Sequence, residues 1–373
     1  MVDARYRLVW PKPLFTWEAQ RVLALPEEMT FAATERLLAE AFSDESVLLA
    51  YRNLFVAWRV QDDDYHLNLR SWLMDLVADD ARLLPYVLPR YYAEREGHSA
   101  RPDQSVGGLG VQFATLLRQM QEDGYFPLAL PRDCVDHPTD WYEVGDRVRQ
   151  AVLIDFRWDG QRDQADAWGR PLLFSLIEYF HDNAQRPRTV GYIHDHGDCG
   201  PHYADHDAES GEAVYRWRVN ELLDRHRVDL NLGRAGDERG RLVHRFGTPL
   251  DDAADRRAAQ EADDPDDEVA HAIRDFRARG ASATQKRGAL VLLAGALEAR
   301  RQEVKVVLGK DEGVLFRLAN EFGLRHRNDR QRMDYGDEFL DYMFSAYLAA
   351  VMLMEALERR RDGQTAATQS NVP

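Results

Sequence analysis

The sequence predicts a mainly α-helical protein with an N-terminal helical domain, a small α+β middle segment and a C-terminal four-helix bundle. Two observations favour this architecture. Apolar residues recur at spacings of three and four through residues 30–92 and 267–357, which is the period of one helix face. Between these regions, short β-like runs and turn signals interrupt that period. The expected parts are residues 1–145, 146–250, an acidic linker at 251–266, the bundle at 267–362 and a frayed polar tail at 363–373.

The N-terminal part is predicted to be a helical bundle that follows an irregular arm. Met1–Glu28 contains Trp, Phe and Pro without a period, so we expect an extended segment there. Thr30–Tyr92 carries four successive apolar faces with short connections, which is typical of a helical bundle. A polar, glycine-rich loop is expected at Gly97–Gly110, and a helix follows over Val111–Glu122.

The middle segment mixes short strands with helices. We expect strands at Ala151–Phe156 and Thr189–Ile193, helices at Pro171–Phe180 and Glu212–His226, and a β-hairpin formed by Val228–Leu232 and Arg241–Phe246. A helix followed by a hairpin fits a winged-helix fragment or an ordinary α+β connection, and the second interpretation is simpler.

The C-terminal part starts after an acidic stretch. Asp251–Glu268 holds nine acidic residues and little apolar content, which predicts a solvated linker or the start of a helix. Helical faces follow at 269–276 and 290–307, and two further apolar helices are expected at 314–322 and 337–357. Together these four helices make a self-contained bundle.

The last of these helices is the most apolar part of the chain. From Tyr342 to Met354 only Ser345 is polar, and a helix that is apolar all round must be buried in a bundle or against a partner. We therefore predict a homodimer through Phe339–Leu357. The apolar run is shorter than the ~20 residues of a bilayer span, so no membrane anchor is expected.

Composition limits the classes of function. The formal net charge of −16 argues against non-specific nucleic-acid binding by the whole molecule, although it leaves room for a local basic site. Cys134 and Cys199 are the only cysteines, too few for a disulfide framework, and the N-terminus has no apolar signal segment. These features predict a cytoplasmic protein.

One basic segment lies between the two last helices, within Asp311–Leu357. Its residues are Arg325, His326, Arg327, Asn328, Arg330 and Arg332. Guanidinium groups bind phosphate oxygens in bidentate fashion, and a histidine transfers protons near neutral pH. This combination suits metal-free RNA cleavage. The alternative is that the arginines pair with the acidic linker, or that His326 only caps a helix.

The segment LFRLANEFGLRHRNDRQRMDY and the following FLDYMFSAYLAAVMLMEAL resemble the C-terminal region of bacterial proteins associated with abortive infection and phage defence. That region is similar to a HEPN-type helical bundle, and the likeness covers about Asp267–Arg360. A looser likeness covers Tyr192–Leu223, where DCGPHY and YRWRVNELL are similar to the segment that precedes the bundle in the same proteins.

The resemblance implies a metal-independent endoribonuclease or a degenerate relative of one. In an active enzyme the chemistry of the basic segment would assign catalysis to Arg325, His326 and Asn328, and RNA binding to Arg327, Arg330 and Arg332. HEPN ribonucleases carry a His roughly four to six residues after the Arg, whereas here His326 follows Arg325 directly. Two other pairs, Arg188 with His194 and Arg239 with His244, have workable spacing, but they are expected on strands or loops. The alternative function is a non-catalytic sensor or adaptor that binds a phage or host partner and self-associates.

Histidines gather in a second cluster. His194, His196, Cys199, His202 and His206 fall within thirteen residues. Close spacing allows chelation of zinc, which takes N and S ligands in a tetrahedron, and we assign His194, His196, Cys199 and His202 as candidate ligands of a structural zinc ion. The alternative is a turn-rich β segment without metal.

Two weaker motifs have simple explanations. Ser105–Gly110 precedes a helix and can cradle a phosphate, but it lacks the Lys and Ser/Thr of a P-loop, so a flexible turn is expected. Glu303 and Lys305 match half of a metal-dependent nuclease core. That core needs a strand, whereas the sequence here keeps a helical period.

Overall fold

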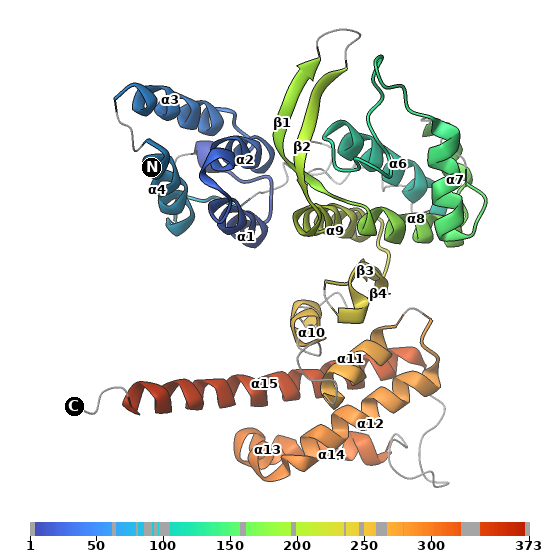
Figure 1. The fold of residues 1–373 in the computed structure, drawn as a ribbon. Helices are drawn as coiled ribbons and strands as arrows, with labels where there is room; N and C mark the ends of the chain where they lie inside the picture. The colour runs from blue at the N-terminus through green and yellow to red at the C-terminus, as the bar shows by residue number, and fades with distance from the viewer. Residues whose placement is uncertain are drawn as a thin grey trace. The chain divides into compact units, whose positions relative to one another are not determined.

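The computed structural model describes residues 4–61, 65–79, 81–85, 92, 96, 105–156, 162–194, 199–234, 236–245, 250–258, 267–278, 280–321 and 336–369. Over these residues the chain is mainly α-helical, as predicted, and it has two small two-stranded sheets (Figure 1). It divides into two compact units, residues 1–222 and 223–373, and the division falls inside the predicted middle segment. Each unit is described by itself.

Unit 1 begins with a group of helices. They are α1 (Lys12–Leu23), α2 (Glu27–Ala41), α3 (Ser46–Gln61) and α4 (Tyr65–Ala78). The prediction of an extended arm over the first 28 residues was wrong from Lys12 onward. The buried face of α1 consists of Phe15, Glu18, Ala19 and Val22. Because a glutamate occupies one position of this face, the apolar period of the helix is not visible in the sequence.

Among its described residues, the second half of unit 1 contains four α-helices and one sheet. These are α6 (Val106–Glu122), α7 (Trp141–Val152), α8 (Arg170–Asp182), β1 (Arg186–His194), β2 (Gly200–Asp207) and α9 (Ala208–Arg225). The predicted helices corresponding to α6, α8 and α9 are confirmed, as is the strand within β1. The predicted strand at Ala151–Phe156 was wrong, because α7 continues to Val152 and Leu153 then takes a left-handed conformation with φ of 56°.

The glycine-rich stretch before α6 serves close packing. α6 begins at Val106, inside the predicted loop, and the Ser105 hydroxyl accepts the Gly108 N–H at 3.0 Å as an N-cap. A Cβ on Gly110 would lie 2.3 Å from the carbonyl oxygen of Ala165, in the short 3₁₀ turn Arg162–Ala167. The glycines therefore allow the helix to approach this turn. The flexible turn expected at Ser105–Gly110 was wrong, because these residues form the N-cap and first turn of α6.

Strands β1 and β2 form a two-stranded antiparallel ribbon (Figure 1). At its base Arg186 pairs with Asp207, and at its tip His194 pairs with Gly200. The register shifts once, between Val190 and Tyr192, where one extra residue forms a β-bulge. We call this pair of strands the ribbon.

Unit 2 starts with the predicted hairpin and continues as helices. The elements are β3 (Leu230–Leu232), β4 (Leu242–His244), α10 (Leu250–Ala258), α11 (Glu268–Arg277), α12 (Ala283–Ala299), α13 (Arg301–Leu308), α14 (Glu312–Glu321) and α15 (Asp337–Gln369). Helix α10 occupies the first half of the predicted acidic linker. The Asp267 carboxylate caps α11, and Ser282 with Gln285 forms a capping box on α12. The described bundle has more than the predicted four helices.

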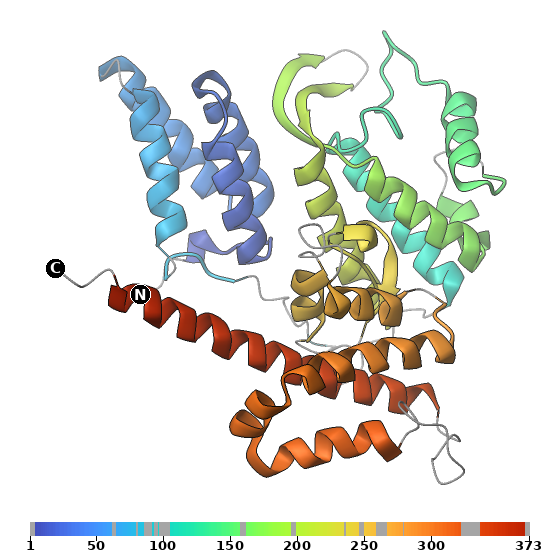
Figure 2. The same cartoon turned by 60° about the horizontal axis from the view of Figure 1, so that its bottom comes forward.

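The core of unit 2 is apolar and continuous. Helices α12 and α15 lie side by side, with α13 and α14 beside them (Figure 2). At the centre, the rings of Phe276 and Phe344 stack at 4.0 Å, and both side chains are fully buried. The predicted burial of the last helix is confirmed for the residues of its inner face. These are Leu340, Met343, Phe344, Tyr347, Leu348, Val351 and Met354.

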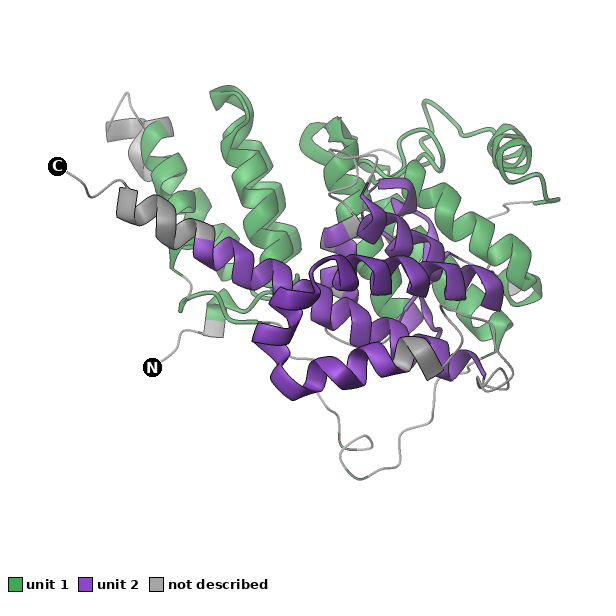
Figure 3. Ribbon diagram, turned by 90° about the horizontal axis from the view of Figure 1, so that it is seen from below, with its two compact units in different colours: residues 1–222 green, residues 223–373 purple. Residues whose placement is uncertain are grey.

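Helix α15 belongs to unit 2 and is longer than the predicted apolar run (Figure 3). Within the described part of the chain, one helical segment, Asp337–Arg361, is long enough and apolar enough to cross a membrane. Its length alone therefore does not exclude a membrane span. In the structure, 44% of this apolar window is buried in the bundle.

Candidate metal centre

The predicted basic segment, Arg325–Arg332, lies outside the described residues, and so does His196. The two alternative Arg–His pairs do not form sites. Arg188 is buried against Glu18, and His194 belongs to a different cluster. In unit 2, His244 faces Asp341 at 3.6 Å, and Arg239 is exposed. Glu303 and Lys305 lie exposed on α13, as the helical interpretation predicted.

Three donor side chains converge at the tip of the ribbon. The Sγ atoms of Cys134 and Cys199 and one ring nitrogen of His194 all lie within 4.8 Å of one another. His194 is the last residue of β1, and Cys199 directly precedes β2, so the ladder pair His194–Gly200 brings these two ligands together. Cys134 comes from the loop between α6 and α7. Three separate segments therefore supply the candidate metal centre.

The loop that carries Cys134 is shaped around its sulfur. The backbone N–H groups of Asp136 and His137, together with the His194 and Cys199 side chains, hold the pKa of the Cys134 thiol below its ordinary value, outweighing partial burial. The His137 N–H also donates to the Cys134 carbonyl at 3.1 Å, which closes a turn. Because the thiolate is the form that binds metals, these donors prepare the sulfur for coordination.

The second thiol and the histidine have matching surroundings. The Val135 N–H donates to Cys199 Sγ at 3.4 Å. His194 places Nδ1 3.5 Å from Cys134 Sγ, and its other nitrogen, Nε2, lies 3.5 Å from the Asp136 carboxylate. A carboxylate on the far nitrogen of a histidine fixes the ring and its tautomer in metal sites. Here the same four-residue turn supplies both a thiol and this carboxylate.

Arg132 fixes the segment around Cys199. Its Nη2 donates to the Cys199 carbonyl at 2.8 Å, and its Nη1 donates to the Pro201 carbonyl. Gly200 has φ of +69°, and a Cβ there would lie 3.3 Å from Arg132 Nη2. The glycine therefore allows both the left-handed turn after Cys199 and the close approach of the guanidinium.

His202, a predicted ligand, lies beside the three donors but outside their 4.8 Å set. Its ring stacks on Tyr192 at 4.2 Å and lies 6.0 Å from the ring of His194. Its Nε2 is buried and has no hydrogen-bond partner among the described residues. Two cavities of 160 and 310 Å³ both reach His202, and they are lined by Cys199 and Cys134 respectively.

His206, the last histidine of the predicted cluster, takes no part in this centre. Its Nε2 lies 3.2 Å from the Gly124 carbonyl oxygen, and burial lowers its pKa. Cys134 is the member of the donor set that sequence reasoning missed, because it lies 60 residues before His194 and has no second cysteine at metal-binding spacing. The one available signal was that Cys134 and Cys199 are the only thiols of the chain.

Comparison of the chain with protein-family models, with curated proteins and with solved structures gives no match. The chemistry of the donor set therefore carries the functional argument.

Proposed function

We propose that Cys134, His194 and Cys199 bind a structural zinc ion and that His202 is the fourth ligand. One observation carries this proposal, which is the convergence of two thiols and an imidazole from three segments within 4.8 Å. Zinc is bound by thiolates and imidazoles in structural sites, and its tetrahedron separates such donors by roughly 3.3–3.8 Å. Small rotamer changes close the distances to that range.

The closed coordination of a structural site is favoured by His202. A buried ring nitrogen without a partner costs free energy unless something binds it, and a metal ion satisfies this nitrogen directly. With four protein ligands no position remains for a water, so the site resembles structural rather than catalytic zinc. The ion then ties the loop after α6 to both strands of the ribbon.

Metal content of the purified full chain tests this proposal. We expect about one zinc per chain, and a loss of bound zinc in both Cys134→Ser and Cys199→Ser. His202→Ala should bind zinc more weakly. His137→Ala is the matched control, because His137 is exposed and lines the same cavity as Cys134 without being a donor of the set. Undiminished zinc in Cys134→Ser would contradict the assignment.

For the chain as a whole we propose a bacterial defence protein of the abortive-infection type. Its C-terminal bundle either cleaves RNA without a catalytic metal or is a degenerate relative of a HEPN ribonuclease. Three observations support this proposal. The C-terminal sequence resembles abortive-infection proteins, the acidic chain carries the basic segment Arg325–Arg332, and helices α14 and α15 lie on either side of that segment. To test for cleavage, RNA is incubated in EDTA with the wild-type protein or with His326→Ala. We expect the wild type to cleave the RNA and the variant to leave it intact.

A non-catalytic sensor or adaptor is the second candidate. On α15, Phe339, Tyr342 and Leu353 stay exposed while the inner face fills the core of unit 2. This outer face supports the proposed homodimer through Phe339–Leu357, although the inner face accounts for most of the apolar run. Two results together would favour the adaptor. RNA stays intact with both the wild type and His326→Ala, and the wild type has the mass of a dimer whereas Tyr342→Lys has the mass of a monomer.

A further inference from the structure

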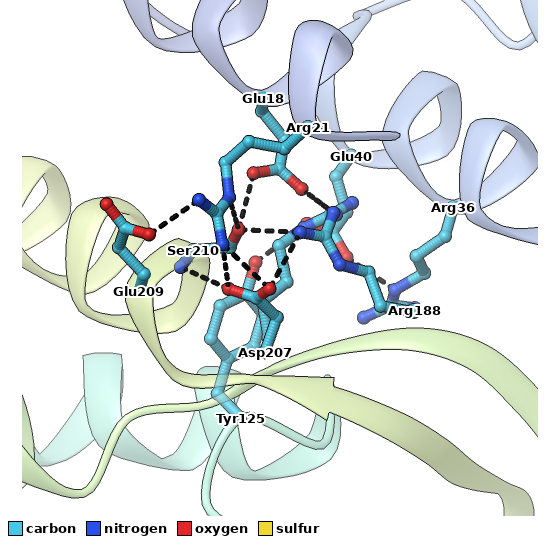
Figure 4. A network of polar contacts seen from close by, with 10 residues as sticks. Glu18, Arg21, Arg36, Glu40, Tyr125, Arg188, Asp207, Glu209 and Ser210 are labelled. Carbon is cyan, nitrogen blue, oxygen red and sulfur yellow. Dashed lines mark hydrogen bonds and ion pairs between the residues drawn. The ribbon is translucent and has the colours of Figure 1, made fainter. Parts of the chain in front are cut away.

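A network of buried charges occupies the base of the ribbon (Figure 4). The Glu18 carboxylate on α1 accepts hydrogen bonds from Arg186, at 2.8 Å, and from Arg188, both on β1. These three side chains are almost completely buried. On α2, Glu40 accepts from Arg186 Nε at 3.0 Å. Two helices of the N-terminal group thus contact β1 through charges rather than through apolar side chains alone.

The end of the second strand joins the same network. Asp207, the last residue of β2, accepts two hydrogen bonds from Arg21 of α1, at 2.9 and 3.0 Å, and lies 3.2 Å from Arg188. The Ser210 hydroxyl donates to Glu18 at 2.6 Å and accepts from Arg188 at 2.9 Å. The network therefore includes charged residues of both strands, and Arg188 of β1 contacts Asp207 of β2 within it.

The ribbon connects this network to the candidate metal centre. β1 carries Arg186 and Arg188 at its start and His194 at its end. β2 begins directly after Cys199 and ends at Asp207. Each strand thus has one end among the candidate metal ligands and the other in the network. The ladder between them keeps one register from Arg186 to Val190, where the pair Arg188–Asp205 is skipped, and shifts once at the bulge at Gly191.

We infer that metal binding at the tip of the ribbon is coupled to the docking of α1 and α2 at its base, an inference that rests on the proposed zinc site. The metal fixes the register and twist of the tip, because it holds His194 and Cys199 on opposite strands. Buried ion pairs tolerate little displacement, since a charge that loses its partner remains desolvated. Zinc therefore favours the ribbon geometry in which α1 and α2 are docked.

Linkage requires the coupling to act in both directions. Weakening the network must lower the affinity for zinc, and removing zinc must loosen the two helices. The bulge at Gly191 is the element that can defeat this coupling. If it absorbs any movement of the tip, the two ends behave independently.

Zinc affinity of the full chain, measured by competition with a chromophoric chelator, tests the first direction. We expect Glu18→Gln to raise the zinc dissociation constant about fivefold or more, the lower end of typical coupling. Ser210→Ala should act in the same direction more weakly, and it keeps every charge if Glu18→Gln folds poorly. Glu35→Gln is the control, because Glu35 pairs with Arg52 at 2.5 Å on α2 and α3, outside the network.

Hydrogen exchange tests the second direction. We expect zinc removal to speed amide exchange in α1 and α2, while α12 in unit 2 stays unchanged. Two results together would overturn the coupling and leave the zinc site intact. Wild type, Glu18→Gln and Ser210→Ala would bind zinc with the same affinity, and zinc removal would leave amide exchange in α1 and α2 unaltered. A wild-type chain that binds no zinc would overturn both proposals, and the metal analysis reveals this first.

Discussion

Both units bury many apolar side chains, but unit 1 also buries a charge network between α1, α2 and β1. In unit 1, Glu18, Arg186 and Arg188 meet between helices and a strand, far from water. In unit 2 the centre is a continuous apolar cluster built around the stacked rings of Phe276 and Phe344. An apolar core tolerates small shifts with gradual loss of contacts, whereas buried ion pairs require particular positions. Unit 1 is thus the unit in which a ligand can control geometry.

Both units bury charged side chains, and they differ in where these side chains lie. Unit 2 also buries a charge, because Arg277 is fully buried and pairs with Asp255 at 2.8 Å and with Glu238 at 3.4 Å. These partners come from α10 and the turn before β4. Arg277 therefore fastens the hairpin and α10 to α11. A second buried cation, Lys286 of α12, pairs with Asp337 and Asp341 of α15 at 3.3 and 3.2 Å.

The largest expected effect is on the apolar unit. Phe344→Ala removes a fully buried ring that stacks on Phe276, and we expect it to lower the free energy of unfolding of unit 2 by about 3–5 kcal/mol. All eight tryptophans of the chain lie in residues 1–222, so their fluorescence reports unit 1 alone. Urea unfolding followed by circular dichroism should show an earlier transition while the tryptophan transition is unchanged.

The matched control for this substitution is Phe339→Ala on the same helix. Phe339 is half-exposed, so its removal should change stability by less than about 1 kcal/mol. An equal loss in both variants would mean that the stacked pair is not the centre of the unit. A shift of the tryptophan transition would mean that the two units unfold together.

Periodicity predicted most of the helices in both units because their buried faces are apolar. It failed at α1, where Glu18 occupies a core position and is satisfied by arginines 168 and 170 residues away. It also failed at Ala151–Phe156, where an apolar run without a stop signal suggested a strand, but α7 ends there through a left-handed Leu153. Local patterns cannot reveal a charge whose partners lie so far along the chain.

The site shows the same limit. Of the four candidate ligands that the histidine cluster predicted, His194 and Cys199 belong to the converging donor set, and they lie five residues apart across the ribbon tip. Cys134 belongs to a distant loop, and only the fold brings it to the other two. The prediction for the basic segment between α14 and α15 falls on residues outside the described part and stays a prediction.

A smaller effect is expected on the stability of unit 1 when the pH is lowered. Although burial acts to raise it, hydrogen bonds from the Ser210 N–H and Arg21 and the charge of Arg188 lower the pKa of Asp207 to about 2. Its folded pKa lies below the ordinary value, so this carboxylate contributes stability above pH ~4 that is lost as the pH falls towards 2. The tryptophan transition should therefore move to lower urea concentration over that range.

Asp207→Asn isolates this contribution. The variant should be less stable at neutral pH and should lose part of the acid dependence between pH 4 and 2. Asp155→Asn is the control, since Asp155 is exposed and lies 3.6 Å from Arg149 at the surface. Identical pH profiles for wild type and Asp207→Asn would show that this carboxylate does not stabilise the base of the ribbon.

The smallest expected effect is the loss of an exposed ion pair of unit 1, and it is compared with the loss of a buried pair in the same unit. Glu35 and Arg52 form an ion pair at 2.5 Å with Arg52 half-exposed, and water screens such a pair. We expect Glu35→Gln to lower the stability of unit 1 by at most about 1 kcal/mol, measured by the tryptophan transition in urea. Glu18→Gln changes the same atoms at a buried position and should cost several times more, because Arg186 and Arg188 then each lose one of two carboxylate partners while they stay desolvated. Equal losses would mean that burial adds nothing to the charge network, and the distinction between the two units would then rest on unit 2 alone.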